Sequence, residues 1–320
     1  MTADVNKALA MLSETDDIAI LLHCYPDGDT IGSGFALYRL LKALGKRARV
    51  ICHDPIPPKY SYIYGGIEFE DFEPRFIVAV DVADTPLFGD SLMKYAQKID
   101  LCIDHHKSNT GYAKNLLLDD SASAASEIIY DIIKTAEIPV SKDMANCIYT
   151  GIATDTGCFK YSNVTGKCHT IAAEMITYGI DFFCINREMF DVKSRARLEI
   201  ERMALDTIEF FFDNKCAVMT ISQAMIDKMG ANEGDLEGLT PIPRQIEGVE
   251  IGVTMRERQD GKFKVSFRTS ESFDASEFCA LLGGGGHSRA AGCTVNGGID
   301  AAKNTIIEKM KEYFAAGTPA

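Results

Sequence analysis

The sequence has no long run of apolar residues, no long polar stretch of low complexity and no internal repeat. No window approaches the roughly 20 consecutive apolar residues that a membrane-spanning helix needs. Residues 1–7 lack the basic and apolar blocks of a signal peptide. A composition that is 46% hydrophobic and 25% charged, without long polar tracts, predicts a globular protein without disordered arms. We therefore expect a cytoplasmic protein that does not interact with membranes.

Cysteine pairs with C-x-x-C spacing are also absent, although the chain has ten cysteines. Their absence argues against a zinc ribbon and against a redox motif. Cys102 and Cys216 lie in strand-like apolar runs, and Cys147 lies in a helical one. We expect reduced thiols that pack as small hydrophobic side chains.

Basic residues are also fewer than acidic ones, and the net charge is -13. Proteins that grip long nucleic acids neutralise many phosphates with Lys and Arg, so a long duplex is a poor partner for this chain. A small anionic ligand remains compatible with it, held by a few local cations and bound metal ions. The carboxylates of a metal site would account for part of this negative charge.

The first half of the chain alternates short apolar runs with segments of helical periodicity. The apolar runs predict strands at residues 17–22, 47–52, 76–80, 99–103 and 115–118. The periodic segments predict helices at residues 31–44, 91–97, 122–134 and 142–152. Continuous apolar strands separated by helices are typical of a mainly parallel sheet covered on both faces. The predicted fold class is α/β.

The second half has a different pattern. Residues 195–212 read as one long amphipathic helix, and residues 249–255 and 262–268 predict a hairpin around Gln259-Asp260-Gly261. The remaining elements expected here are strands at 216–221 and 293–295, a helix at 275–282 and a closing helix. We therefore predict an α/β domain at residues 1–190, a linking helix at 191–212 and a smaller α+β domain at 213–320.

Histidine and aspartate follow the first predicted strand in the segment His23-Cys-Tyr-Pro-Asp27-Gly-Asp29. Ligands collect at the carboxyl ends of strands in open α/β sheets, and a turn at Pro26 and Gly28 lets all three side chains point at one centre. An ordinary turn followed by a helix cap at Asp29 or Thr30 explains the same residues equally well.

Two further strand ends carry similar residues. Asp81 follows the strand at 76–80, although a loop or capping aspartate would also fit there. Asp104-His105-His106 follows the strand at 99–103 and is hard to explain by packing. Neutral imidazole and carboxylate suit Mn, Fe or Zn, and a carboxylate beside a ligating histidine orients it.

Asp155, in Thr154-Asp155-Thr156-Gly157, ends a helical run and would by itself be interpreted as an ordinary surface residue. Its significance comes from the other acids, which a parallel sheet brings together. Clustered carboxylates repel one another unless divalent cations compensate them. The candidate ligands outnumber what one ion needs, so two ions sharing a carboxylate are the natural solution, and such pairs suit hydrolysis at phosphorus.

A glycine run, Gly283-Gly-Gly-Gly286, precedes His287-Ser-Arg289. We interpret it as an anion-binding nest of backbone N–H groups at a helix start, with His287 and Arg289 as side-chain donors. A flexible loop is the alternative. Nearby strands carry Arg256 and Arg268, whose planar groups suit phosphate or base contacts, although solvated surface positions are equally compatible.

Taken together, these motifs resemble the DHH phosphoesterases that have a DHH-associated C-terminal domain, and the resemblance covers nearly the whole chain. His23-x-x-Pro-Asp27-x-Asp29, Asp81, Asp104-His105-His106 and Asp155 match the four N-terminal motifs in order, and residues 283–292 match the C-terminal glycine motif. The family's Ser-x-Arg-Ser stands here as Ser266-Phe-Arg268-Thr269, which retains a hydroxyl.

The resemblance implies two Mn²⁺ ions, for which Mg²⁺ or Co²⁺ could substitute. It implies His23, Asp27 and Asp81 as ligands of one ion, and Asp29, Asp81, His105 and Asp155 as ligands of the other. Asp104 would orient the histidines, and His106 would face the scissile phosphate. In the family the C-terminal domain closes over the active site and holds the rest of the nucleotide. The residues implied here are Gly284, Gly285, Gly286, His287, Arg256 and Arg268.

The compact two-domain form resembles the nanoRNase and pAp phosphatase group of this family. The implied reaction is hydrolysis of short oligoribonucleotides and linear dinucleotides (pApA, pGpG) to mononucleotides, and also of the nucleotide bisphosphate pAp to AMP. Hydrolysis of intact cyclic dinucleotides and nucleotide sensing without hydrolysis are the alternatives. The sequence does not rank these substrates, and it is compatible with a homodimer.

Overall fold

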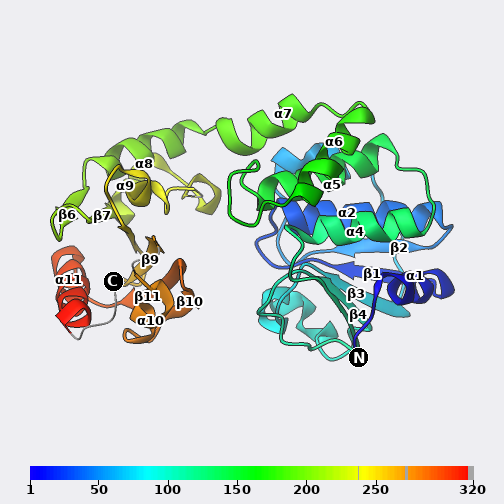
Figure 1. Cartoon of the computed structure of the whole chain (residues 1–320), viewed down its shortest axis with the longest axis horizontal. Helices are drawn as coiled ribbons and strands as arrows, with labels where there is room; N and C mark the ends of the chain where they lie inside the picture. Colours follow the sequence, from blue (N-terminus) through cyan, green and yellow to red (C-terminus); the bar gives the residue numbers. More distant parts are fainter. Residues whose placement is uncertain (237, 271–272, 316–320) are drawn as a thin grey trace. The chain divides into compact units, whose positions relative to one another are not determined.

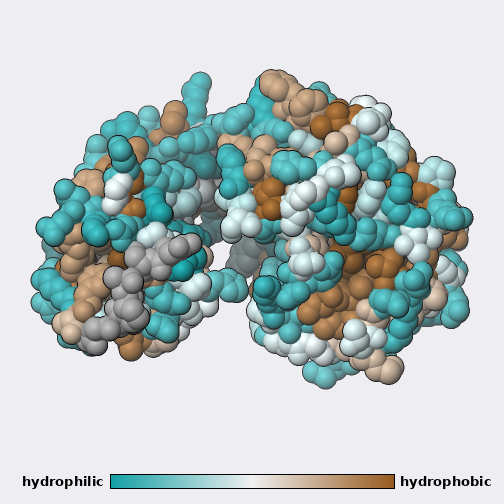
Figure 2. Space-filling view, viewed as in Figure 1, coloured by the Kyte–Doolittle hydropathy of each residue, from teal (hydrophilic) through white to brown (hydrophobic). Residues whose placement is uncertain are grey.

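A computed structural model describes residues 1–236, 238–270 and 273–315 of the 320-residue chain. The chain divides into two compact units, Met1–Val192 and Lys193–Ala320, and each has its own sheet and core. Within each unit the helices lie against the sheet (Figure 1). The visible surface of both units is mainly hydrophilic, with a hydrophobic patch over the sheet of the first (Figure 2). Among the described residues, no helix has the length and hydropathy needed to cross a membrane.

The first unit contains the predicted parallel sheet, which confirms the α/β class. Its five strands follow the order β2-β1-β3-β4-β5, and every neighbouring pair is parallel. The strands are β1 (Ile18–Leu21), β2 (Ala48–Ile51), β3 (Phe76–Val80), β4 (Leu101–Asp104) and β5 (Asn115–Leu118). The chain runs from β1 outward to β2 and then crosses back to β3. The direction of winding therefore reverses between β1 and β3, where α/β sheets bind ligands at the carboxyl ends of their strands.

Helices cover this sheet on both faces. The larger core lies under α1 (Val5–Glu14), α2 (Gly28–Ala43), α4 (Ala125–Thr135), α5 (Lys142–Asp155) and α6 (Gly166–Thr177). The other face packs against short 3₁₀ turns that include Phe88 and Leu92. Two short helices, α3 (Ser61–Tyr64) and α7 (Phe182–Asn186), complete the unit. The helices α1, α3, α6 and α7 lie outside the predicted elements.

One predicted helix of this unit is wrong in type. The segment expected to be helical at residues 91–97 is a 3₁₀ helix over Asp90–Tyr95. Gly89, with φ +70°, starts it, and the amide N–H groups of Leu92 and Ala96 donate to carbonyls three residues earlier. Short isolated segments do not sustain an α-helix, and the tighter turn satisfies the same backbone groups.

The second unit contains a mixed sheet of six strands in the order β10-β11-β9-β8-β7-β6. The strands are β6 (Glu209–Phe211), β7 (Cys216–Ile221), β8 (Ile251–Glu257), β9 (Phe263–Thr269), β10 (Gly285–His287) and β11 (Ala290–Val295). The predicted hairpin is confirmed as β8 and β9, which pair antiparallel. One face packs on α10 (Ala275–Ala280) and α11 (Ile299–Ala315), while α8 (Arg195–Leu205) and α9 (Gln223–Met229) pack on part of the other.

The helix expected at residues 195–212 is shorter than predicted, because it ends at Leu205. The Thr207 hydroxyl is hydrogen-bonded to the backbone of Thr220 in β7, and Glu209–Phe211 then pair with β7 as strand β6. Helix α8 itself buries Ile200 and Ala204 against the second unit's sheet. Tertiary pairing with β7 thus overrides the helical periodicity after residue 205. All ten cysteines are free thiols, as predicted.

Candidate metal centre

His23 and Asp27 lie just beyond the end of β1. Asp27 is the N-cap of α2, and its Oδ1 accepts hydrogen bonds from the N–H groups of Asp29 (3.0 Å) and Thr30 (3.2 Å). The capping role that the sequence allowed for Asp29 or Thr30 therefore falls to Asp27. The Nδ1 of His23 lies 2.8 Å from the carbonyl oxygen of Cys24, which can only accept, so the lone pair of this ring is on Nε2. That Nε2 lies 3.6 Å from Asp27 Oδ1.

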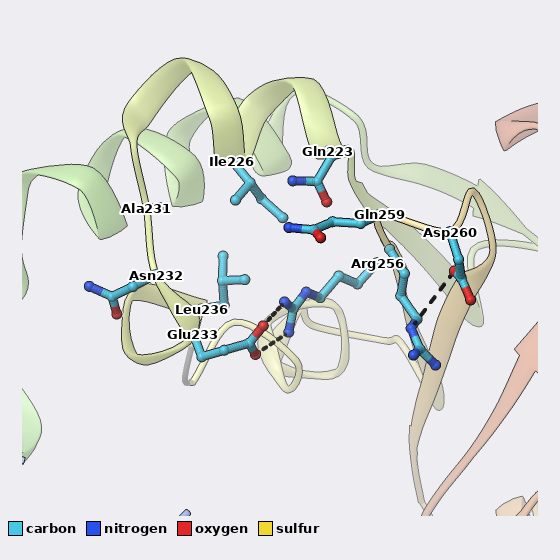
Figure 3. A pocket seen from close by; sticks show the side chains of 10 residues that line it. Gln223, Ile226, Ala231, Asn232, Glu233, Leu236, Arg256, Gln259 and Asp260 are labelled. Carbon is cyan, nitrogen blue, oxygen red and sulfur yellow. Dashed lines mark hydrogen bonds and ion pairs between the residues drawn. The ribbon is translucent and has the colours of Figure 1, made fainter. Parts of the chain in front are cut away.

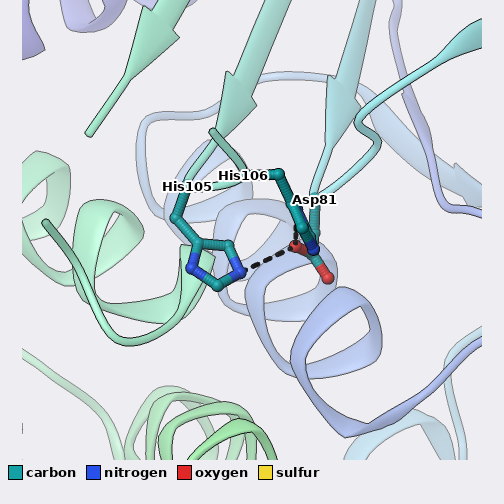
Figure 4. A group of neighbouring side chains, drawn as sticks. All are labelled: Asp81, His105 and His106. Atoms are coloured by element: carbon teal, nitrogen blue, oxygen red, sulfur yellow. Dashed lines mark ion pairs between the residues drawn. The ribbon is translucent and has the colours of Figure 1, made fainter. Parts of the chain in front are cut away.

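Asp81 occupies the middle of the candidate centre. It directly follows β3, and its left-handed φ of +60° turns the side chain inward while its N–H still donates to the carbonyl of Ile103. Such a φ is uncommon for residues other than glycine and is tolerated best by Asn and Asp. The Asp81 side chain is 3% exposed, with Oδ1 3.5 Å from His105 Nε2 and Oδ2 3.8 Å from His23 Nε2. Figure 4 shows the two histidines pointing at this carboxylate.

Asp104, the last residue of β4, holds His106 in place. Its fully buried carboxylate lies 2.8 Å from His106 Nδ1 through Oδ1, which also accepts from the backbone N–H groups of both histidines. Its Oδ2 accepts a 2.6 Å hydrogen bond from the amide of Asn109. Asn109 is a residue that the sequence reasoning missed, and its place five residues after Asp104 was the only signal.

His105 points its second ring nitrogen at the acids. Its Nδ1 lies 3.2 Å from the carbonyl oxygen of Ala122, so Nδ1 carries the proton and Nε2 keeps the lone pair. That Nε2 lies 3.5 Å from Asp81 Oδ1, 3.7 Å from Asp155 Oδ2 and 3.9 Å from Asp29 Oδ2. The histidine therefore faces three carboxylates from three different elements.

The buried carboxylate of Asp29 is fixed by the start of helix α4. It accepts hydrogen bonds from the N–H groups of Ala125 (2.6 Å) and Ser126 (3.0 Å) and from the hydroxyl of Ser126 (2.6 Å). A carboxylate at a helix N-terminus also interacts favourably with the helix dipole. Asp155 reaches the centre from the last turn of α5, where the amide of Asn163 donates to its carbonyl oxygen at 3.2 Å.

Glycines let α2 and α5 approach closely enough to bring these acids together. A Cβ atom at Gly151 in α5 would lie 1.9 Å from the Ser126 hydroxyl and 2.6 Å from Asp29 Oδ1. A Cβ at Gly32 in α2 would lie 2.4 Å from the carbonyl oxygen of Cys147. The absent side chains therefore create the space that Asp29 and its helix occupy.

The acids of the centre are poorly compensated by protein groups alone. Burial, together with the charges of Asp29 and Asp27, raises the pKa of Asp155 to about 8. The same causes raise the pKa of Asp81 well above its usual range, and burial raises the pKa of Asp29. The hydrogen bond to Asp104 raises the pKa of His106, which favours its protonated form. Divalent cations would replace the protons that the acids otherwise retain.

The side chains fit divalent cations. Three overlapping groups, His23-Asp27-Asp81, Asp29-His105-Asp155 and Asp81-His105-His106, each bring ligand atoms within 4.8 Å of one another. Asp81 Oδ1 and His105 Nε2 are buried and have no hydrogen-bond partner in the described part of the chain. Buried polar atoms are seldom left unpaired, and cation binding would satisfy both. Because His106 Nδ1 is already bonded to Asp104, the first two groups are the better cation sites.

The predicted substrate residues all lie in the second unit. Arg256 on β8 forms ion pairs with Glu233, and Arg268 on β9 donates a 2.9 Å hydrogen bond to the carbonyl of Phe267. Lys264 lies directly opposite Arg256 in the β8–β9 ladder and was missed. The alternation of Lys264, Ser266 and Arg268 with buried Phe263, Val265 and Phe267 was the signal that could have revealed this polar face.

The glycine run does not precede a helix, so this part of the prediction is wrong. Gly285 and Gly286 form the exposed strand β10 with His287, which pairs with β11, and Gly284 comes just before it. Strand β11 offers a free edge to this segment because its other edge pairs with β9. Arg289 is not a free donor either, since its Nη1 donates to the carbonyls of Ser270 (2.8 Å) and Phe273 (3.2 Å).

Carboxylates and imidazoles lie at the carboxyl ends of β1, β3 and β4 of a parallel sheet, an arrangement that suits a metal-dependent phosphoesterase. Residues 17–152 match the model of the DHH family, N-terminal domain, and residues 213–316 match the DHHA1 domain. The chain belongs to the DHH family, and the predicted resemblance is confirmed.

The chain aligns with known proteins over most of its own length and most of theirs. The bifunctional oligoribonuclease and PAP phosphatase NrnA of Thermus thermophilus is 31% identical, covering 98% of this chain and 93% of its own. A probable bifunctional oligoribonuclease and PAP phosphatase NrnA of Streptococcus mutans is 28% identical over 89% of this chain and 91% of its own. The crystal structure of an exopolyphosphatase-related protein from Bacteroides fragilis is 26% identical, with a TM-score of 0.86 over 97% of this chain and 96% of the other.

Proposed function

We propose that the protein hydrolyses short oligoribonucleotides and linear dinucleotides such as pApA and pGpG to mononucleotides, and also pAp to AMP. The observation that carries the proposal is Asp81, which belongs to two of the candidate ligand groups and has a buried, unpaired oxygen. The names of the relatives in Thermus thermophilus and Streptococcus mutans support this substrate class. The net charge of -13 supports short substrates rather than long duplexes. We propose that the protein acts in the cytoplasm.

The proposed cofactor is a pair of Mn²⁺ ions, with Mg²⁺ or Co²⁺ as substitutes. In this proposal His23, Asp27 and Asp81 hold one ion, while Asp29, Asp81, His105 and Asp155 hold the other. Mixed imidazole and carboxylate ligands suit a transition metal such as Mn²⁺. When bound, two such ions would activate the attacking water and neutralise charge on the phosphate.

Residues of the chain are proposed to position the proton donor and to bind the substrate. Asp104 accepts a hydrogen bond from His106 Nδ1 and so fixes the ring, which leaves Nε2 to donate to the phosphate or to the leaving oxygen. The hydrogen bond from Asn109 keeps the carboxylate of Asp104 in position. In this proposal residues 1–190 perform catalysis, the segment 191–212 links the domains, and residues 213–320 bind substrate. The substrate-binding residues proposed there are Arg256, Arg268, Gly284, Gly285, Gly286 and His287.

A substrate panel with added Mn²⁺ tests the proposal directly. The panel contains pApA, pGpG, pAp, a short RNA and the corresponding cyclic dinucleotides, with products resolved by chromatography. We expect mononucleotides from the linear compounds. Hydrolysis of the cyclic forms alone would reject the proposed substrate class.

A double variant tests the site. Asp104→Ala combined with His105→Ala should abolish Mn²⁺-dependent release of mononucleotide from pApA. The matched control, Asp90→Ala with His53→Ala, removes an acid and an imidazole of the same unit that lie outside the candidate ligand groups. Unchanged turnover in the first variant would contradict the assignment of the site.

A further inference from the structure

The guanidinium group of Arg256 is occupied by a carboxylate of the same chain. Its Nη1 donates a 2.7 Å hydrogen bond to one oxygen of Glu233, and its Nη2 donates to the other oxygen (Figure 3). Two parallel N–H···O bonds of this kind are also how arginine binds a phosphate. Glu233 therefore occupies the position that an anionic ligand of Arg256 would take.

The position of this carboxylate has the features of an anion site. Lys264 lies opposite Arg256 in the ladder between β8 and β9. The hydrogen bond from Arg256, with a further contribution from the charge of Lys264, lowers the pKa of Glu233. The Nε of Arg256 is buried and lacks a hydrogen-bond partner among the described residues. The carboxylate thus bonds to one cation and feels the charge of a second, while Arg256 keeps one donor unused.

The two partners differ in how firmly they are held. Arg256 is 25% exposed and lies on β8, an inner strand between β7 and β9. Glu233 is 72% exposed and begins the short 3₁₀ turn Glu233–Leu236, three residues after the left-handed Gly230 that ends α9. Ion pairs with so exposed a partner contribute little free energy. The carboxylate can therefore move away while the arginine stays in place.

A cavity beside the pair has room for a nucleoside. It measures about 500 Å³, and its lining combines the side chains of Ile226 and Leu236 with the amides of Gln223 and Gln259. A smaller hollow of about 60 Å³ is lined by Arg256 and Lys264. Apolar walls with a few amide groups suit a base and its polar edge, and the cations suit a phosphate.

We propose that Glu233 competes with the ligand for the anion site on Arg256 and Lys264, so that a nucleotide's terminal phosphate must displace it. The inference rests on the proposed function for its substrate class. It makes Glu233 a specificity-determining residue that weakens the binding of nucleotides whose terminal phosphate reaches this site. A dinucleotide without a terminal phosphate, such as ApA, leaves the internal ion pair intact.

Glu233→Gln tests the inference because it removes the charge and keeps the shape. We expect the KM for pApA to fall about fivefold with kcat unchanged, whereas the KM for ApA stays constant. Glu209→Gln is the matched control, since Glu209 is also exposed and pairs with Lys303 of the same unit at 2.6 Å. It should change neither KM. A KM for pApA that is unchanged or higher in Glu233→Gln would show that the pair only anchors the turn, and would overturn the inference.

Two further readouts separate this inference from the proposed function. Hydrolysis of bis(p-nitrophenyl) phosphate reports on the metal centre alone and should be equal in wild type and Glu233→Gln. Calorimetric titration with AMP in the presence of a chelator reports on binding without catalysis. We expect Glu233→Gln to bind AMP about fivefold more tightly than wild type. Activity on the nitrophenyl ester without hydrolysis of pApA would reject the proposed function, while the titration would still decide the role of Glu233. Equal AMP affinity in both proteins would overturn the inference.

Discussion

Oδ1 of Asp81 lies 3.5 Å from Nε2 of His105, and both atoms are buried without a hydrogen-bond partner in the described part of the chain. The two residues come from the ends of neighbouring strands, β3 and β4. Leaving such atoms unpaired costs free energy, and a bound cation removes that cost. The geometry of the centre therefore suits bound cations. We expect the stability of the protein to differ between its metal-free and metal-bound states.

Asp81→Asn should separate stability from metal binding. It removes a buried carboxylate whose pKa is raised well above the usual range, and asparagine tolerates the left-handed φ of +60°. We expect a higher Tm for the metal-free variant than for the metal-free wild type, and no further rise with Mn²⁺. Activity should fall by more than about 100-fold, since even outer partners of metal ligands contribute 10–100-fold.

Asp90→Asn is the control for this prediction, because Asp90 is an exposed acid of the same unit. Calorimetry with and without Mn²⁺ provides both measurements. A variant at Asp81 that still gains stability from Mn²⁺ would show that the shared ligand has been assigned wrongly.

His106→Asn should lower kcat without removing the metal. Nδ1 of His106 is hydrogen-bonded to Asp104 at 2.8 Å and is therefore not available to the ligand group around Asp81, so the proposed function assigns Nε2 the role of proton donor. Loss of general acid catalysis typically costs about 10²–10⁴-fold in rate. Mn²⁺ binding, measured by calorimetric titration, should remain close to wild type. His105→Asn should instead lose Mn²⁺ binding, and equal metal loss in both variants would refute the division of roles.

The metal-free protein should lose stability as the pH rises. The pKa of Asp155 is about 8 in the folded chain, against a usual value of 3.8, so the folded state retains a proton that the unfolded state releases. Where the folded state binds more protons, the free energy of unfolding falls with increasing pH. The Tm measured in chelator should therefore decrease from about pH 4 to about pH 8.

Asp155→Asn isolates this effect, since other groups titrate over the same range. The Tm of this variant should exceed that of wild type by an amount that grows with pH up to about 8. A difference that stays constant or shrinks with pH would contradict the raised pKa.

Gly151→Ala should damage the centre through packing alone. The new Cβ would lie 1.9 Å from the Ser126 hydroxyl and 2.6 Å from Asp29 Oδ1, so α4 and the carboxylate must shift. We expect a loss of about 1–3 kcal/mol in the free energy of unfolding, together with weaker Mn²⁺ binding. Gly166→Ala, at the first position of α6 where the Cβ meets nothing within 4 Å, is the control and should be neutral or stabilising. Equal effects of the two substitutions would contradict the packing argument.

The sheet of the first unit could be predicted because strands that are buried on both faces consist of continuous apolar residues. Phe76–Val80 is buried at every position, and Asp81 follows it without interruption. Once such strands are parallel, their ends share one edge, so the residues after β1, β3 and β4 could be placed together before any coordinates. The hairpin of β8 and β9 was predictable from its turn for the same kind of local reason.

Other features depended on pairing with a neighbouring strand of the sheet. The segment after Leu205 has helical periodicity, but Thr207 bonds to Thr220 and draws the chain into the sheet. The glycine run became strand β10 because β11 offers it an edge. In both cases the free energy of pairing within the sheet exceeds the local conformational preference of the segment.

The sequence by itself determined the chemistry of this protein: which residues can bind divalent cations, that they follow buried parallel strands, and that the chain is a DHH phosphoesterase. Only the tertiary structure decided which of these side chains contact one another and which form hydrogen bonds or ion pairs with other residues of the chain. Ser126 holds Asp29, Asn109 holds Asp104, and Glu233 occupies Arg256, although at least one partner in each pair looks unremarkable in sequence. The physical reason is that hydrogen bonds and ion pairs act over a few ångströms in space, whereas sequence patterns report only the periodicity of burial along one element.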